Sequence, residues 1–585
     1  MPPFTPRVWR GAMVRLHRVR HGGWVDLLLV LGLAGLLFGL VDLLGEATAV
    51  HRPVADIDLS LAALPRYTFY SLTRGVTAYA LSLAFTLAYG YWAAKDPAAE
   101  RVLLPLLDVL QSIPVLSFMP GILLAMVALF PGSNVGLELA AVVSIFTGQV
   151  WNMVFSLYHS LRSIPADRAE VAAVFRFSGW QRAKWVELPS AAIGLIWNSM
   201  MSMAGGWVFL TVIESFKLRN QDYRLPGLGS YLSEAWKQGE YGAMAAGMAA
   251  MVLMIVGLDR LVWRPVVVWA QKFRAEDDAG GVAERSWVLD TLRRSRLIRW
   301  LGGKVARRFR RRHTTGQSPR AASRESSTPS QPPWAKYASP IALALLLLLL
   351  GYGTWRLVLL LTDVTVADWG RIAAAGGLTL GRVTLATFLG TVWVLPVGLV
   401  IGLSPRVAAW AQPVVQVIAS YPAPILYPIF VAAFLAVGLP LGWGSIALMM
   451  LGTQWYILFN VISGAMALPA DLREAARSYR LPLGLRLRAV YLPGVFPYLV
   501  TGWVTAAGGA WNLSIVSEYV TVGEGHVEQA RGLGAMISDA FDRGPEAFPV
   551  LAASTLALAA IVVLINRTAW RALYRLAETR YTLTK

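Results

Sequence analysis

The chain has 585 residues, of which 56% are hydrophobic and 15% charged. Because soluble domains carry roughly 25% charged residues, this composition predicts an integral membrane protein that lies in a lipid bilayer. The absence of cysteine excludes disulfides, thiol catalysis and thiolate metal sites, and the six histidines show no metal-ligand spacing. The net charge of +19 lies largely in one central linker and in short loops, as the positive-inside rule predicts, so we expect no nucleic-acid partner.

The first half of the chain contains six hydrophobic stretches long enough to cross a bilayer. The first, near 24–44, follows a basic tail, and no small-residue cleavage site stands out after it. We therefore interpret it as an uncleaved span that enters from the cytoplasm. Counting through the spans places 215–240 outside the cell and 265–337 inside, and the arginine runs of the latter agree. The other five spans are expected near 68–94, 105–130, 137–158, 190–214 and 241–264.

A single boundary divides the chain. Residues 271–337 are basic, and their last part is rich in Ser, Pro and Gln, with too little apolar surface to fold. We therefore expect a first membrane half over 1–270, a disordered cytoplasmic linker over 271–337 and a second membrane half over 338–585.

The second half repeats the plan of the first. Trp151 matches Trp455 at a separation of 304 residues, and the motif Gly227-Leu228-Gly229 matches Gly532-Leu533-Gly534. Six spans in each half is an even number, so the repeats are expected to be parallel and related by an axis along the membrane normal. The fold class is thus an all-α membrane protein of about 12 transmembrane helices in two six-helix repeats. The spans of the second half are expected near 338–361, 376–403, 412–437, 442–466, 494–517 and 547–566.

Two polar loops, 164–189 and 468–493, occupy matching positions in the two halves. Each begins Pro-Ala-Asp, reaches a glutamate five residues after the proline and closes on Leu-Pro. Proline at the first helical position costs no hydrogen bond, and aspartate in the first turn suits the helix dipole. Each loop is therefore predicted to be a short helix, a turn and a second short helix, and the pair is typical of docking surfaces.

The two loops resemble the EAA loop of type I ABC importer permeases, whose coupling helix docks on an ATPase subunit. Where that family usually carries glycine, six residues past the glutamate, this chain has Arg176 and Arg480, and its glycines come later. The first helix of each loop is therefore expected to run for an extra turn. The residues that the resemblance assigns to ATPase coupling are Asp167, Glu170, Ala172, Ala173, Gly179, Asp471, Glu474, Ala475, Ala476 and Gly484.

The resemblance implies a fused double permease of the nitrate/sulfonate/taurine type. Its expected function is that of the transmembrane subunit of an ATP-driven importer for a small anion such as nitrate, a sulfonate or bicarbonate. Its expected location is the bacterial inner membrane, with both termini cytoplasmic. Its expected partners are two ATP-binding cassette subunits, which hold ATP and Mg, and a periplasmic substrate-binding protein. Because no Gly-x-x-x-x-Gly-Lys-Ser/Thr run occurs, the chain itself is expected to bind no cofactor and not to be an enzyme.

Three pairs of residues are candidates for the transport pathway or its gate. A glutamate ends the fifth span of each half, a tryptophan follows small residues in the same span, and a proline interrupts the third span. The alternatives are a solvated helix end for the glutamates and ordinary packing for the tryptophans. We expect the glutamates to be held by the outer loops, through arginines such as Arg219 or Arg531, rather than to touch substrate. The six candidates are Glu214, Glu518, Trp207, Trp511, Pro114 and Pro422.

A secondary transporter of the major facilitator type, also built from two six-span halves, is the alternative function. It would need no ATPase and would show inverted three-span repeats inside each half, together with intramembrane ionisable residues for ion coupling. We find no such internal similarity and few charges within the spans. A structural protein without transport remains a third class, but it would not explain two matched docking loops.

Overall fold

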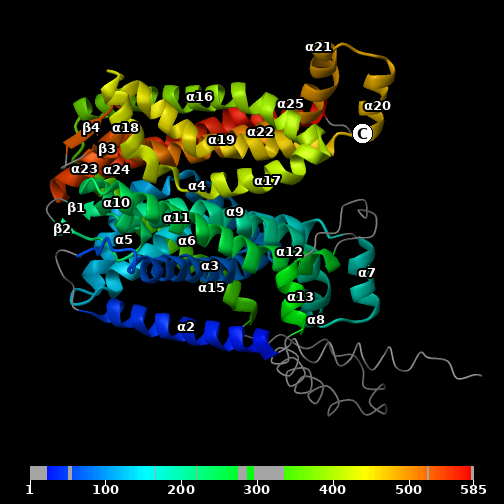
Figure 1. The fold of residues 1–585 in the computed structure, drawn as a ribbon, viewed down its shortest axis with the longest axis horizontal. Helices are drawn as coiled ribbons and strands as arrows, with labels where there is room; N and C mark the ends of the chain where they lie inside the picture. Colours follow the sequence, from blue (N-terminus) through cyan, green and yellow to red (C-terminus); the bar gives the residue numbers. More distant parts are fainter. Residues whose placement is uncertain are drawn as a thin grey trace, which may run out of the picture.

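Two sets of long, roughly parallel helices lie side by side, one from each half of the chain (Figure 1). Helices account for nearly all the regular structure, which confirms the all-α class. Two small strand hairpins, which the sequence analysis did not predict, are the exception among the described residues. The computed structural model describes residues 23–49, 56–164, 166–218, 221–273, 286–294, 335–522 and 526–581.

The first half contains these elements in chain order. Its main helices are α2 (Gly23–Thr48), α3 (Leu64–Lys95), α4 (Pro97–Ser112), α5 (Val115–Leu129), α6 (Val135–Arg162), α9 (Leu188–Glu214) and α11 (Tyr241–Leu258). The shorter elements are α7 (Ala166–Val174), α8 (Gly179–Arg182), the π-helix η1 (Ala183–Glu187), β1 (Lys217–Leu218), β2 (Gln221–Asp222), α10 (Leu228–Lys237), the π-helix η2 (Asp259–Trp263), α12 (Arg264–Ala270), η3 (Gln271–Phe273) and α13 (Trp287–Arg294).

The second half repeats this order. Its main helices are α15 (Ala335–Leu361), α16 (Val366–Leu403), α17 (Pro405–Ser420), α18 (Tyr427–Ala436), α19 (Leu441–Ala467), α22 (Leu492–Ser517) and α24 (Phe548–Ile565). The shorter elements are η6 (Ala423–Leu426), α20 (Ala470–Ser478), α21 (Leu483–Arg486), the π-helix η7 (Leu487–Tyr491), β3 (Tyr519–Val522), β4 (His526–Gln529), α23 (Leu533–Arg543), η8 (Pro545–Ala547), the π-helix η9 (Asn566–Trp570) and α25 (Arg571–Arg580).

Every predicted span coincides with a long helix or with a bent pair of helices. Nine helices in the described part of the chain are long and apolar enough to cross a membrane. The predicted third span of each half is instead broken, by 96° between α4 and α5 and by 72° between α17 and α18. Helix α3 is 32 residues long but falls outside the nine, because its central stretch is rich in Tyr, Gly, Ser and Thr and is therefore less apolar.

The two ends of the molecule differ in character. The short helices of both polar loops, α7 with α8 and α20 with α21, project from the same end, which we call the loop end (Figure 1). Both strand hairpins and the short helices α10 and α23 lie at the opposite end, the hairpin end. This arrangement is the one expected of parallel repeats, because each half presents its corresponding parts on the same side.

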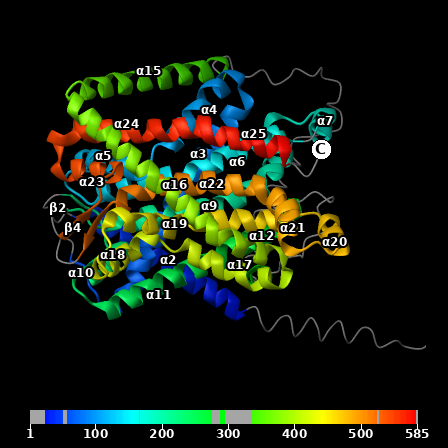
Figure 2. The ribbon, with the colours of Figure 1, turned by 90° about the horizontal axis from the view of Figure 1, so that it is seen from above.

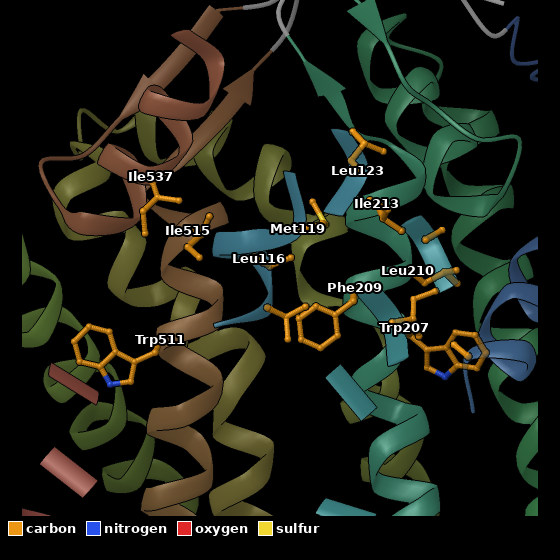
Figure 3. Close-up of a cluster of buried hydrophobic side chains, with 14 of the residues drawn as sticks. Leu116, Met119, Leu123, Trp207, Phe209, Leu210, Ile213, Trp511, Ile515 and Ile537 are labelled. Atoms are coloured by element: carbon orange, nitrogen blue, oxygen red, sulfur yellow. The ribbon is translucent and has the colours of Figure 1, made fainter. Parts of the chain in front are cut away.

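The two halves share one hydrophobic core. Buried side chains of α5 and α9 in the first half and of α22 and α23 in the second belong to a single cluster (Figure 3). Helix α5 contacts α22, and reciprocally α9 contacts η6, the turn at the corresponding break of the second half. The matched contacts confirm two-fold pseudosymmetry between the halves.

Helix α15, which begins the second half, packs on the first half. It lies beside α4 and α24 (Figure 2), and its Leu343 is buried against the first-half residues Ala93 and Leu103. The indole nitrogen of Trp92 donates to the Ser339 hydroxyl at 3.0 Å, and that hydroxyl donates in turn to Asp96. This hydrogen bond from Ser339 holds the pKa of Asp96 below its usual range. The first helix after the linker is therefore tied to both halves.

Candidate functional site

Each polar loop folds into two short helices joined by a residue in the left-handed conformation. That residue is Arg176 in the first loop, with φ 48°, and Arg480 in the second, with φ 51°. Helix α7 ends at Val174 and α20 ends at Ser478, so the predicted extra helical turn is wrong. The chain reverses at the position where the related family usually carries glycine, although an arginine costs strain there.

An equivalent backbone hydrogen bond ends the first helix of each loop. The Phe177 amide donates to the Ala172 carbonyl at 2.9 Å, and the Leu481 amide donates to the Ala476 carbonyl at 3.1 Å. A bond of this span across a left-handed residue is the Schellman motif, which satisfies carbonyls at a helix end. Both alanines are buried, which explains the small residue two positions after the glutamate in each loop.

Most of the rest of each loop is open to solvent. The predicted coupling residues Asp167, Glu170, Gly179, Asp471, Glu474, Ala475 and Gly484 are all exposed, and the Ala173 side chain lies outside the described part of the structure. Large apolar side chains are exposed with them, namely Val174, Phe175, Trp180, Tyr479 and Leu483. Exposed apolar groups on a projecting loop are typical of an interaction surface. The assignment of these residues to coupling stays a prediction.

The two loops are anchored to the helices in different ways. In the first half, the buried carboxylate of Glu187 accepts from the Tyr91 hydroxyl at 2.7 Å and pairs with Lys95 and Arg182. In the second half the matching position is Tyr491, which packs against an apolar cluster. One loop is thus fixed by ion pairs and the other by apolar packing.

At the hairpin end, Glu214 is completely buried in a set of donors. The Arg74 Nη1 donates to it at 2.7 Å, the Ser71 hydroxyl at 2.7 Å and the Gly229 amide at 2.8 Å. Arg74 also forms a two-bond ion pair with Glu138, at 2.6 and 2.7 Å. We call this set, Ser71, Arg74, Glu138, Glu214 and Gly229, the first clamp. It ties α3, α6 and α9 to the first turn of α10.

The second half contains a matching set. Glu518 is completely buried and accepts from Arg382 Nη1 at 2.8 Å, from the Thr379 hydroxyl at 3.0 Å and from the Gly534 amide at 2.9 Å. Arg382 Nε, however, donates to the backbone carbonyl of Gly442 at 3.0 Å instead of to a carboxylate. We call Thr379, Arg382, Gly442, Glu518 and Gly534 the second clamp.

The clamps explain the repeated Gly-Leu-Gly motif. A Cβ atom on Gly227 would lie 2.4 Å from the Glu214 carboxylate, and one on Gly532 would lie 2.2 Å from that of Glu518. Only glycine allows the backbone to wrap so closely around each carboxylate.

Arginines hold the two glutamates, as the sequence analysis expected, but these arginines lie on long helices. They are Arg74 on α3 and Arg382 on α16. Arg219 lies outside the described residues, and Arg531 contributes its backbone carbonyl, which accepts from Arg382. Sequence reasoning missed Arg74 and Arg382, although an arginine at matched positions of two spans is itself a signal of a buried ion pair.

The two tryptophans pack inside their own halves. Trp207 and Trp511 lie at opposite edges of the shared core, whereas Phe209 lies between the two sets of helices (Figure 3). A Cβ atom on Gly75 of α3 would lie 2.8 Å from the Trp207 ring, which shows how closely the two helices pack. This placement favours ordinary packing, and a role at the gate stays a prediction.

The prolines mark the breaks of the two third spans. Pro114 precedes α5, and the amide freed there, that of Val115, donates to the Asn512 side chain of the other half at 2.7 Å. Pro422 precedes η6 in the second half. Polar backbone inside the membrane is thus satisfied by protein in the first half, as required.

Comparison with known proteins places the chain in a family. The family described as binding-protein-dependent transport system inner membrane component matches it twice, over residues 86–262 and 394–581. Because these matches cover more than half of the chain, it belongs to that family, with one copy in each half.

Curated relatives are similar over part of the chain. A nitrate import permease protein of Leptolyngbya laminosa is 28% identical over 30% of this chain and 58% of its own length. A bicarbonate transport system permease protein of Synechococcus elongatus is 28% identical over 34% of this chain and 67% of its own length. A taurine transport system permease protein of Escherichia coli is 26% identical over 29% of this chain and 57% of its own length.

Proposed function

We propose that this chain is the membrane subunit of an ATP-driven importer that moves a small anion across the bacterial inner membrane by alternating access. The observation that carries the proposal is the pair of matched loops at one end of a family member. Both loops reverse at a left-handed arginine, and both expose apolar side chains. Relatives named for nitrate, bicarbonate and taurine support an anionic substrate.

The two loops would each dock on one ATP-binding cassette subunit in the cytoplasm. Contact would remove the exposed rings of Phe175 and Tyr479 from water, at roughly 25 cal/mol per Å² of apolar surface. ATP and Mg would be held by those subunits, because this chain has no phosphate-binding loop. The chain itself would therefore not be an enzyme, and one copy would serve two ATPase subunits.

A continuous helical rod would carry the movement of each loop to the opposite end. In the first half the helical run from Gly179 to Glu214 has 36 residues, or about 54 Å at 1.5 Å per residue. It starts in the loop and ends in the first clamp. In the second half the run from Leu483 to Ser517 ends beside Glu518 of the second clamp. Closure of two ATPase subunits would thus act directly on both clamps.

The energy that the coupling must supply is moderate. Shifting a two-state gate from 1:99 to 99:1 takes about 5.5 kcal/mol of differential stabilisation.

Both clamps are intact in this structure, with both carboxylates paired and buried, so we interpret them as locks of one state of the outer gate. Substrate would arrive at the hairpin end from a periplasmic binding protein.

The docking test uses charge reversal in the loops. Glu170→Lys or Glu474→Lys should abolish co-purification with the ATPase subunits, or uncouple ATP hydrolysis from uptake of nitrate, bicarbonate or taurine in proteoliposomes. Glu528→Lys, on the hairpin at the opposite end, is the matched control and should leave docking unchanged. Wild-type assembly and uptake in both loop variants would refute the docking assignment.

Two further measurements separate the importer from its alternatives. The mass of the purified complex should correspond to one copy of this chain with two ATPase subunits, and two copies per ATPase pair would contradict the proposal. Uptake should require ATP. Uptake driven by an ion gradient alone would instead identify a secondary transporter.

A further inference from the structure

The two clamps differ at one position. Glu138 in the first half corresponds, 304 residues later, to Gly442 in the second. Arg74 is therefore paired with two carboxylates, Glu138 and Glu214, whereas Arg382 is paired with Glu518 alone. The charges of the first clamp sum to −1 and those of the second to zero. The second clamp lacks one negative charge that the first contains.

On the side of Arg382 that faces this missing carboxylate, one of the two nitrogens has no protein acceptor among the described residues. Arg74 donates to Glu138 through both Nε and Nη2. Arg382 directs Nε to the Gly442 carbonyl and Nη1 to Glu518 and the Arg531 carbonyl, but its Nη2 has no acceptor among the described residues. The side chain keeps 11% of its surface exposed, against 1% for Arg74. A charged donor is thus left open at the place that Glu138 fills in the first half.

The surroundings of Arg382 Nη2 also favour an anion. A Cβ atom on Gly442 would lie 3.6 Å from Nη2, so the glycine leaves space where the first half has a side chain. Gly442 lies in the first turn of α19, whose N-cap residue, Pro440, provides no side-chain cap and whose first turn contains no acidic residue. In α6 the first turn contains Glu138. The positive end of the α19 dipole therefore adds to the charge of Arg382.

We propose that Arg382 and the first turn of α19 form a binding site for one small oxyanion, at the place that Glu138 occupies in the first half. The open Nη2 of Arg382 is a charged donor with two N–H groups, and charge-assisted donors of this kind bind the oxygens of carboxylate, nitrate, bicarbonate, phosphate and sulfonate. The occupant is either a free anion from the outer side or the phosphate of a lipid headgroup. The proposal of a free anion rests on the proposed function and would make the second half the side of the gate that senses substrate. Binding would give both clamps the same net charge.

The test measures anion binding directly, without transport. The full chain, purified in a phosphate-free detergent, is unfolded by heat in sodium nitrate or in sodium chloride at equal ionic strength. Nitrate should raise the midpoint of the wild type by about 1–3 °C in a saturable way. Gly442→Glu, which restores the first-half carboxylate, should remove this rise. Gly442→Ala, whose Cβ makes only an ordinary contact with Arg382, should retain it.

A second variant keeps the test decisive if Gly442→Glu fails to fold. Glu138→Gly makes the first half match the second, because it removes both the carboxylate and the side chain next to Arg74, and it should create a second saturable response to nitrate. Native mass spectrometry distinguishes the two sources of the anion. Phosphatidylglycerol retained by the wild type and lost in Gly442→Glu would identify a lipid headgroup, and a nitrate response without bound lipid would identify a free anion.

The proposal is overturned if the nitrate response and the lipid content are the same in the wild type and Gly442→Glu. This outcome is distinguishable from a failure of the proposed function, because neither measurement uses ATP, a partner subunit or uptake. Conversely, nitrate binding at Arg382 without ATP-driven uptake would support the binding site and refute the proposed importer function.

Discussion

At the scale of single residues, two arginines stand where a related chain would have glycine. Arg176 and Arg480 adopt the left-handed conformation, which costs an L-residue roughly 1–2 kcal/mol. The Schellman bonds to Ala172 and Ala476 hold that conformation in place. Strain of this kind persists only where the surrounding structure determines it, and it is often found at functional sites.

Arg176→Gly and Arg480→Gly should therefore relieve strain in the two loops. We expect the Phe177 and Leu481 amides, which close the Schellman bonds, to exchange with solvent about fivefold more slowly, as expected for about 1 kcal/mol. Valine at either position should accelerate exchange instead, because a β-branched side chain fits this conformation poorly. Hydrogen exchange measured by mass spectrometry over each loop decides the matter, and equal rates in the glycine and valine variants would contradict the explanation.

The buried glutamates give a second prediction at this scale. In Glu214→Gln, Arg74 retains the carboxylate of Glu138, and we expect a loss of about 1–2 kcal/mol in the free energy of unfolding. In Glu518→Gln, Arg382 retains no carboxylate, and we expect a loss of about 3–5 kcal/mol. The measurements are the unfolding midpoint of each variant and the basal ATPase activity of its complex, which a loosened gate should raise. Equal losses, or a larger loss for Glu214→Gln, would show that Glu138 does not share the charge of Arg74.

At the scale of elements, the broken third spans bring the two halves into contact. The 96° bend between α4 and α5 directs α5 into the core shared with α22. The bend is stable because the freed Val115 amide finds the Asn512 side chain across the interface. The first half has Val208 at the position matching Asn512, so the break of the second half lacks an equivalent polar contact across the interface and folds instead into the turn η6.

Asn512→Leu should leave the Val115 amide without an acceptor. The expected cost is about 1–3 kcal/mol, because a part-buried donor loses the one acceptor that the described residues provide, while the branched shape of the side chain is kept. The change would appear as a lower unfolding midpoint of the purified chain. Val208→Leu, at the matched position of the first half, is the control and should cost less than half as much. Similar losses in both variants would mean that packing, rather than the hydrogen bond, stabilises the bend.

At the scale of the whole molecule, the two halves form one unit through their shared core and through α15. Helix α15 belongs to the second half by sequence but binds the first half through Trp92, Asp96 and the apolar cluster around Leu343. The segment that joins the halves, from 295 to 334, lies outside the described residues. The division at 271–337 therefore stays a prediction.

Cutting the chain within 300–330, at an introduced protease site, should leave the two halves associated. The core around α5, α9 and α22 and the contacts of α15 do not depend on the covalent connection. After cleavage the two fragments should elute together in detergent and retain most of the unfolding midpoint of the intact chain. The uncut protein treated with the same protease is the control. Separation of the fragments would show that the linker is required for association.

The sequence by itself determined the class of the protein, the order of its hydrophobic segments, the duplication and the two polar loops. These depend on hydrophobic runs and on repeated motifs, which can be read without knowing which segments touch. It also identified Glu214, Glu518 and the Gly-Leu-Gly motifs as matched features, but not as parts of one site.

Only the tertiary structure decided what these features contact. Arg74 precedes Glu214 by 140 residues and Arg382 precedes Glu518 by 136, so no local pattern joins them. The first helix of each loop ends at a Schellman bond that places an arginine in the left-handed conformation. Residue propensity alone does not predict a helix end at an arginine. The difference between Glu138 and Gly442 became informative only when both were found against equivalent arginines, because the charge of a clamp is a property of its assembled side chains.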